Sequence, residues 1–263
     1  MTTQRIFDWT PQAVVFDCDG TLVDSERHWQ QARDIVLREN GAAPDPEFTE
    51  RSKGLHYTEC GALMARLAGR PDAGEEMTRH LLATFRALVA QCPVAVRGAP
   101  GLVTSLSRSA PLAVASNCPA DVVEFSLQSV GLRQRFRHIV VPGPGVRPKP
   151  SPDTYAEAVR RLGAECRNAL AVEDSLNGLK AAAGAGLRVI GVGRNPRPEA
   201  LALADLWVDT LEDPDLVAWA KSRPAARRQE ARRQEAGAPH TAPVRPKIPQ
   251  QGGRAQSGAR TAP

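Results

Sequence analysis

Short apolar runs recur along the chain, and their spacing narrows the possible folds more than any other feature. They are rich in Val, Ile and Ala, and they lie at Ala13–Phe16, Leu112–Ala115, Ile139–Val141, Leu170–Val172 and Val189–Val192. Helical patterns that end at a glycine follow three of these runs, at Asp121–Val130, Pro152–Leu162 and Leu176–Ala185. Apolar strands that alternate with helices are typical of a parallel sheet buried on both faces. The sequence therefore predicts an α/β fold whose core is a Rossmann-like, doubly wound parallel sheet.

The interval between the first and second runs has a different pattern. No strand is expected there, and three amphipathic stretches occur, at Glu26–Glu39, Thr58–Leu67 and Glu75–Ala90. We interpret this interval as an inserted helical cap domain. The predicted division is core 1–23, cap 24–97, core 98–220 and a terminal tail 221–263.

The basic character of the chain resides in that tail. Residues 221–263 contain ten Lys or Arg and two Glu, whereas the whole chain has a net charge of +5, so the preceding 220 residues carry −3. The tail has six prolines and no aromatic residue, so we predict that it is disordered. A basic arm for nucleic acid or an acidic partner is the alternative, but nucleic acid is not expected because base-stacking side chains are missing.

Cysteine usage and hydropathy bear on the compartment. The five cysteines are odd in number and widely spaced, which argues against a disulfide framework. The N-terminus has no continuous apolar stretch as long as the core of a signal peptide, and no segment has the roughly 18 apolar residues of a membrane span. We expect a cytoplasmic protein without membrane contact, present as a monomer or weak homodimer.

Two carboxylates follow the first strand. Asp17 and Asp19 are two residues apart, so strand periodicity places them on one side, and Gly20 allows a sharp turn after them. Two neighbouring carboxylates stay ionised when a cation lies between them, and Mg²⁺ prefers such oxygen ligands. Glu173 and Asp174 follow the fourth strand and are predicted to complete a Mg²⁺ site.

Two further strand ends carry polar groups. Ser116 and Asn117 follow the second strand, and Lys149 lies between two prolines after the third. Open α/β sheets bind ligands at the carboxyl ends of their strands, and a fixed lysine reduces the repulsion between a phosphate and a carboxylate. The set predicts phosphoryl transfer, in which Asp17 attacks phosphorus to form an aspartyl-phosphate. Asp19 would protonate the leaving alkoxide and then deprotonate water.

These motifs resemble those of the haloacid dehalogenase superfamily, over residues 11 to about 215. The run from Phe16 to Glu26 is similar to its first motif, and Ser116, Lys149 and Glu173–Asp174 fall in the next three, in order. The resemblance implies that Asp17 is nucleophile and metal ligand, that Asp19 also ligates through its backbone carbonyl, and that Asp174 completes the site. It implies that Glu173 binds Mg²⁺ directly or through water.

The cap resembles that of the subgroup containing phosphoglycolate phosphatase, 6-phosphogluconate phosphatase and β-phosphoglucomutase. This implies a phosphatase of a small phosphorylated metabolite, a sugar or sugar-acid phosphate. We expect Asn117 to bind substrate together with a cap loop, whose candidate residues are Arg51, Lys53, Gly54 and Tyr57.

Two other functions stay open at this stage. One is a phosphosugar mutase, although Trp29 and Tyr57 stand where that enzyme has a histidine and an arginine, and His28 is one position away. The other is a non-catalytic scaffold that binds through its basic tail. Hinges for cap closure are expected near Val23–Ser25 and Arg97–Pro100.

Overall fold

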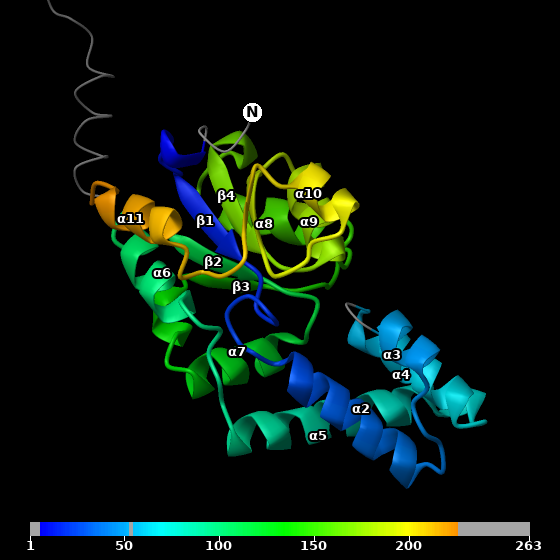
Figure 1. The fold of residues 1–263 in the computed structure, drawn as a ribbon. Helices are drawn as coiled ribbons and strands as arrows, with labels where there is room; N and C mark the ends of the chain where they lie inside the picture. Colours follow the sequence, from blue (N-terminus) through cyan, green and yellow to red (C-terminus); the bar gives the residue numbers. More distant parts are fainter. Residues whose placement is uncertain (1–5, 53–54, 226–263) are drawn as a thin grey trace, which may run out of the picture.

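The computed structural model describes residues 6–52 and 55–225, and these form a parallel sheet beside a helical cap (Figure 1). The sheet has six strands in the order β3-β2-β1-β4-β5-β6, with every neighbouring pair parallel. The strands are β1 (Ala13–Phe16), β2 (Leu112–Ala115), β3 (His138–Val140), β4 (Ala169–Glu173), β5 (Arg188–Val192) and β6 (Leu206–Val208). The order reverses at β1, so the chain winds in both directions from this central strand.

Helices cover both faces of the sheet because alternate strand residues point to opposite sides. Val14 and Phe16 of β1 pack with α6 (Ala99–Leu106), α7 (Ala120–Ser129) and α11 (Pro214–Ser222). On the other face, Ala13 and Val15 pack with α8 (Asp153–Arg161), α9 (Leu176–Gly184) and α10 (Pro198–Leu203). Figure 1 shows these two helical layers on either side of the sheet. The predicted α/β, doubly wound architecture is confirmed.

The cap is a separate group of helices with its own apolar core. It contains α2 (Glu26–Glu39), α3 (Pro46–Ser52), α4 (Tyr57–Leu67) and α5 (Gly74–Gln91). Its core includes Val36, Met64 and Phe85, one from each of the three longer helices. Those three helices lie where the amphipathic stretches predict them, whereas α3 was not predicted.

Two chain segments join the cap to the sheet domain, and they lie side by side. Val23 forms an antiparallel bridge with Ala95. The amide of Asp24 donates to the Val94 carbonyl at 2.9 Å, and that of Val96 donates to the Leu22 carbonyl at 3.0 Å. The first hinge segment predicted from the sequence is therefore part of this short ladder, which continues with residues just before the second.

The sheet domain contains several helices and a strand that the sequence did not predict. The edge strand β6 and helices α6, α10 and α11 were not predicted, and α11 continues to Ser222, past the expected boundary at residue 220. Beyond it, Arg223 donates to the Trp9 carbonyl at 3.2 Å. The sequence predicts disorder for the whole tail, residues 221–263, whereas Lys221 and Ser222 belong to α11. Residues 226–263 lie outside the described part of the chain. Among the described helices, none has both the length and the apolar character required to cross a membrane.

Gly191 in β5 leaves space for the side chain of Trp207 in the edge strand β6. A Cβ at Gly191 would lie 2.2 Å from Cε3 of Trp207. We expect Gly191→Ala to lower the free energy of unfolding by about 1–3 kcal/mol, since the partly buried ring of Trp207 would have to shift. Urea denaturation measures this change. Gly101→Ala in α6 is the control, because its Cβ would meet no atom within 4 Å; equal stability of the two variants would contradict the prediction.

Candidate active site

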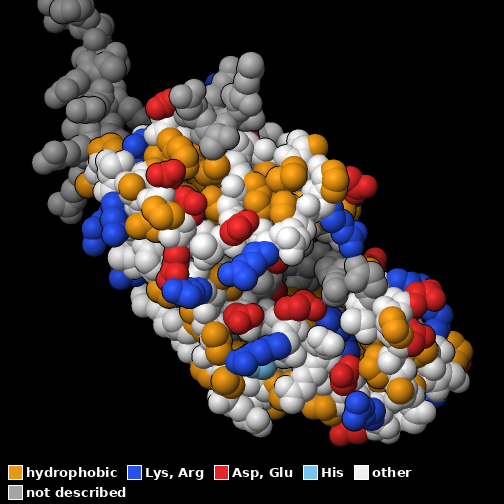
Figure 2. Space-filling view, viewed as in Figure 1, with side chains coloured by type: hydrophobic (Ala, Val, Ile, Leu, Met, Phe, Trp, Pro, Cys, Tyr) orange, Lys and Arg blue, Asp and Glu red, His pale blue; other side chains and the backbone are white. Residues whose placement is uncertain are grey.

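A cavity of about 670 Å³ opens at the carboxyl ends of the strands, between the sheet domain and the cap. Figure 2 shows the molecule hollowed between these two parts. The sheet domain contributes polar residues that the sequence singled out, namely Asp17, Asp19, Ser116, Asn117, Lys149 and Asp174. From the cap, the lining includes Trp29, Arg33, Arg51 and Tyr57. The four sequence motifs therefore converge on one site although they are far apart in the chain.

Lys149 forms two buried ion pairs at the centre of this site. Its Nζ lies 2.6 Å from Oδ1 of Asp17 and 2.8 Å from Oε1 of Glu173. Burial lowers the pKa of Lys149, but the charges of Asp17 and Glu173 raise it, and the net direction is well above its ordinary value. The lysine is therefore charged, and it holds the Asp17 carboxylate in place.

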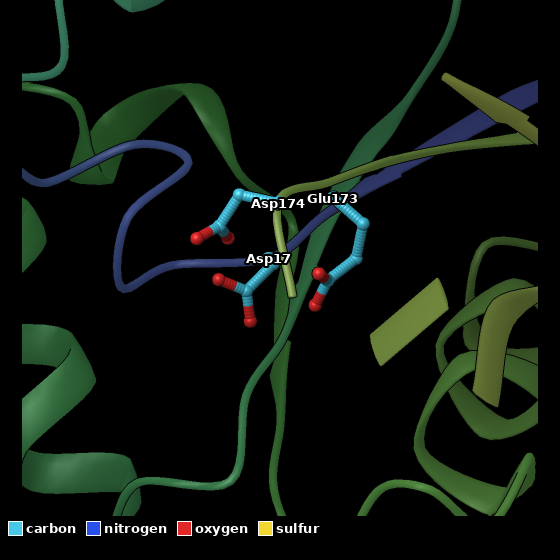
Figure 3. Close-up of side chains that lie close together, drawn as sticks. All are labelled: Asp17, Glu173 and Asp174. Carbon is cyan, nitrogen blue, oxygen red and sulfur yellow. The ribbon is translucent and has the colours of Figure 1, made fainter. Parts of the chain in front are cut away.

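Three carboxylates lie close enough to share a cation. Asp17, Glu173 and Asp174 each offer an oxygen, and these oxygens lie within 4.8 Å of one another. In Figure 3 the carboxylates of Asp17 and Asp174 approach each other from the ends of neighbouring strands, with that of Glu173 beside Asp17. Burial raises the pKa of Asp17 well above its ordinary value, Lys149 lowers it, and the neighbouring carboxylates raise it. Burial, followed by the charge of Glu173, raises the pKa of Asp174 to about 8. A divalent cation would relieve this crowding of negative charge, so the donor set fits a hard metal ion.

The turn after β1 fixes the position of the Asp174 carboxylate. Thr21 Oγ1 donates to Oδ1 of Asp174 at 2.9 Å. Gly20 has φ +90°, and a Cβ at this position would lie 2.3 Å from Oδ2 of Asp174. A glycine is needed here for both reasons, because L side chains rarely adopt this φ and the carboxylate occupies the space.

Glu173 is fully buried and both of its oxygens accept hydrogen bonds. Oε1 accepts from Lys149, while Oε2 accepts from the Ser175 amide at 2.7 Å and its hydroxyl at 3.1 Å. A Cβ at Gly178 would lie 1.7 Å from Oε1. Glu173 is therefore fixed in position, and it links Lys149 to the start of α9.

The side chain of Asp19 points toward the cap. Oδ1 accepts from Ser25 Oγ at 2.7 Å and from Trp29 Nε1 at 3.0 Å, and Oδ2 accepts from Cys118 Sγ at 3.2 Å. Trp29 in turn stacks on Phe85 at 3.7 Å between ring centroids. The contact between Trp29 and Asp19 thus joins the apolar core of the cap to a carboxylate of the sheet domain.

Asn117 connects two loops of the site. Its side-chain oxygen accepts from the Lys149 amide at 2.8 Å, and its nitrogen donates to the Lys149 carbonyl at 3.1 Å. Ser116 is buried, and its Oγ accepts from the Cys118 amide at 3.0 Å. The side chain of Asn117 therefore positions the backbone of Lys149, and its predicted contact with substrate stays a prediction.

The candidate substrate residues of the cap divide into two groups. Arg51 and Tyr57 line the cavity. Lys53 and Gly54 lie outside the described residues. His28 does not belong to the cavity lining; it is buried in α2, and burial lowers its pKa.

Two features of the site were missed by sequence reasoning. One is the hydrogen bond from Trp29 to Asp19, which depends on how the cap is oriented. The other is the loop Gly193–Arg197 between β5 and α10, which borders the cavity. Its position after a strand of the predicted sheet was the available signal, because every such loop faces the ligand-binding edge.

Comparison with known proteins identifies the family of this chain. Residues 14–192 match the family model for haloacid dehalogenase-like hydrolases. The chain is 29% identical over 204 residues to validoxylamine A 7'-phosphate phosphatase of Streptomyces hygroscopicus subsp. limoneus, covering 77% of this chain and 95% of that protein. It is 30% identical over 180 residues to 6-phosphogluconate phosphatase of Escherichia coli, covering 68% of this chain and 80% of the relative.

A solved structure agrees with the fold. CbbY from Rhodobacter sphaeroides in complex with phosphate has a TM-score of 0.68 and 32% sequence identity, covering 78% of this chain and 96% of CbbY. The phosphatase relatives and the family match confirm the predicted class of enzyme, a hydrolase of phosphoric monoesters. The chain belongs to the haloacid dehalogenase-like hydrolase family.

Proposed function

We propose that the protein is a Mg²⁺-dependent phosphatase that hydrolyses a sugar phosphate or sugar-acid phosphate through an aspartyl-phosphate. The observation that carries this proposal is the pairing of Asp17 with Lys149 at the end of β1, beside Asp174 and two residues before Asp19. Such a group provides a nucleophile, a fixed positive charge and an acid. All three lie at one edge of the sheet and line one cavity.

The side chains divide the chemistry as follows. An oxygen of Asp17 attacks phosphorus, the bond to the alcohol oxygen breaks, and Asp19 gives that oxygen a proton. Asp19 then takes a proton from water, and the hydroxide attacks the aspartyl-phosphate to release phosphate and regenerate Asp17. Lys149 offsets negative charge on Asp17 and on the phosphoryl oxygens throughout.

Asp17, Asp174 and the backbone carbonyl of Asp19 would hold Mg²⁺, with Glu173 directly or through water. When bound, the ion supplies positive charge that offsets the repulsion between the phosphate and these carboxylates. Because Asp17, Glu173 and Asp174 offer oxygens within 4.8 Å, this chain has the ligand type and spacing for the role.

The substrate class is supported by the relatives and by the cavity. One relative is named for 6-phosphogluconate and another for validoxylamine A 7'-phosphate, both phosphorylated polyhydroxy compounds. The cavity of about 670 Å³ is large enough for such a molecule. Polar side chains of the cap, including Arg51 and Tyr57, would contact the alcohol portion of the substrate.

Phosphate release from a panel of sugar, polyol and sugar-acid phosphates and phosphoglycolate tests the proposal. Release with Mg²⁺, and its loss after chelation with EDTA and recovery on adding Mg²⁺, is the expected result. Conversion of a phosphosugar into its isomer, with a bisphosphate requirement and no phosphate release, would identify a mutase instead. If neither phosphate release nor isomerisation occurs, the non-catalytic scaffold is the remaining hypothesis.

Trp29 is expected to position Asp19 during turnover. Trp29→Phe removes the indole donor but keeps a ring to stack on Phe85, so we expect kcat to fall about 3- to 30-fold with little change in KM. Steady-state kinetics measure both constants. Trp219→Phe is the matched control, because its indole donates to the Trp9 carbonyl at 3.2 Å outside the cavity. An unchanged kcat in Trp29→Phe would contradict this role.

A further inference from the structure

The cavity lining extends along the sheet from the ends of β1 and β4 to the end of β5. The first end holds the carboxylates of Asp17, Asp19 and Asp174 together with the ammonium of Lys149, and the second is bordered by the loop Gly193–Arg197. This loop contains two arginines, Arg194 and Arg197, and no acidic residue. A ligand that extends through the cavity along the sheet therefore has the carboxylates and Lys149 near one of its ends and a loop containing arginine near the other.

The strand order sets the distance between these two ends. Asp17 follows β1 and the loop follows β5, with β4 between them in the sheet. Neighbouring strands are separated by about 4.8 Å, so the loop begins about 10 Å away from the β1 axis. A phosphorylated chain of about five or six carbons covers that span at ordinary bond lengths.

Arg194 is available for an external anion. Its side chain is exposed and borders the cavity, and no other described residue forms an ion pair or hydrogen bond with its guanidinium. The cap arginines on the same cavity are already paired, Arg33 with Glu26 at 3.0 Å and Arg51 with Glu47 at 3.2 Å. A guanidinium forms paired, directional hydrogen bonds to a carboxylate or a phosphate.

The first residue of the loop is hydrogen-bonded to Trp207 of the edge strand β6. Trp207 Nε1 donates to the Gly193 carbonyl at 2.8 Å, and its ring packs against Gly191. Trp207 also lines the cavity, so the backbone that precedes Arg194 is held by a side chain of the site. The point at which the loop leaves β5 is therefore fixed by this hydrogen bond.

We propose that Arg194 binds a second anionic group of the substrate, at the end of the molecule opposite the reacting phosphate. The preferred substrates are then phosphoric monoesters of five- or six-carbon alcohols with a carboxylate or second phosphate at the far end. This inference rests on the proposed function, because it requires the reacting phosphate to lie at Asp17.

Two esters that differ only in the far group provide the test. 6-Phosphogluconate and glucitol 6-phosphate share a six-carbon chain, but one ends in a carboxylate and the other in a hydroxymethyl group. We expect the wild type to have the higher kcat/KM for 6-phosphogluconate. Arg194→Ala should lower that value about 10- to 100-fold, mainly through KM, and change kcat/KM for glucitol 6-phosphate less than about threefold.

Glucitol 1,6-bisphosphate as a third substrate distinguishes the two possible anions. A larger loss for the bisphosphate than for 6-phosphogluconate assigns the site to phosphate, and the reverse assigns it to carboxylate. Arg108→Ala is the control, since Arg108 is exposed after α6 and does not line the cavity. Its kinetics should equal those of the wild type.

The outcomes that overturn the inference can be told apart from failure of the proposed function. If the wild type hydrolyses both esters and Arg194→Ala lowers both equally or neither, only the second anion site is wrong. If the wild type releases phosphate from no compound of the panel, the proposed phosphatase is wrong and the anion site with it.

Discussion

Asp17→Asn is expected to lower the rate of phosphate release by more than about 10⁴-fold while the protein stays folded. The amide cannot form the acyl phosphate, and nucleophile removal in enzymes that use covalent catalysis has effects of this size. The fold should persist because asparagine has nearly the same shape and Lys149 keeps its contact with Glu173 at 2.8 Å. Steady-state phosphate release and the thermal unfolding midpoint measure the two effects.

Asp72→Asn is the matched control for this variant. Asp72 is exposed in the cap and does not line the cavity, so the same chemical change there should leave the rate as in the wild type. Acid quenching during turnover, followed by mass spectrometry, should find a phosphate on Asp17 in the wild type and none in Asp17→Asn. Activity of Asp17→Asn within tenfold of the wild type would rule out the nucleophile assignment.

Lys149→Met is expected to reduce both activity and stability. The substitution leaves Asp17 and Glu173 buried without their shared cation, and losing one partner of a buried ion pair costs about 3–5 kcal/mol. For a domain of this size the melting temperature should fall by roughly 10 °C. Loss of a charge beside the phosphoryl group should also lower kcat by about 10²- to 10³-fold.

The two effects of Lys149→Met can be measured separately. Calorimetry gives the change in stability without substrate, and phosphate release well below the melting temperature gives the change in rate. Lys180→Met is the control, because Lys180 is exposed on α9 and outside the cavity. A Lys149→Met protein with the melting temperature of the wild type would show that the buried pairs do not stabilise the fold.

The parts of the fold that the sequence predicted share a physical property. Strands β1 and β2 are buried on both faces, so their residues form unbroken apolar runs that are easy to recognise. The edge strand β6 has three residues, and the side chain of Trp207 is only partly buried, so its pattern resembles that of a loop. Helix α10 has six residues, too few to show a helical period.

The site divides in a similar way. Asp17, Lys149 and Asp174 each follow a strand of the predicted parallel sheet, so local patterns alone place them at one edge. The contact between Trp29 and Asp19 depends on the orientation of the cap, which no local pattern encodes. The proposed role of the loop Gly193–Arg197 depends on strand order, because its distance from Asp17 follows from β4 lying between β1 and β5.

The ladder between residues 22–24 and 94–96 means that the chain leaves and re-enters the sheet domain at adjacent points. For the sheet domain, the whole cap is thus one long closed loop between β1 and β2. The entropy cost of closing such a loop grows only with the logarithm of its length, about 0.6 kcal/mol for each doubling. Caps of very different size could therefore be exchanged at this junction with little change in the stability of the sheet, so evolution could alter substrate choice while leaving the catalytic scaffold intact.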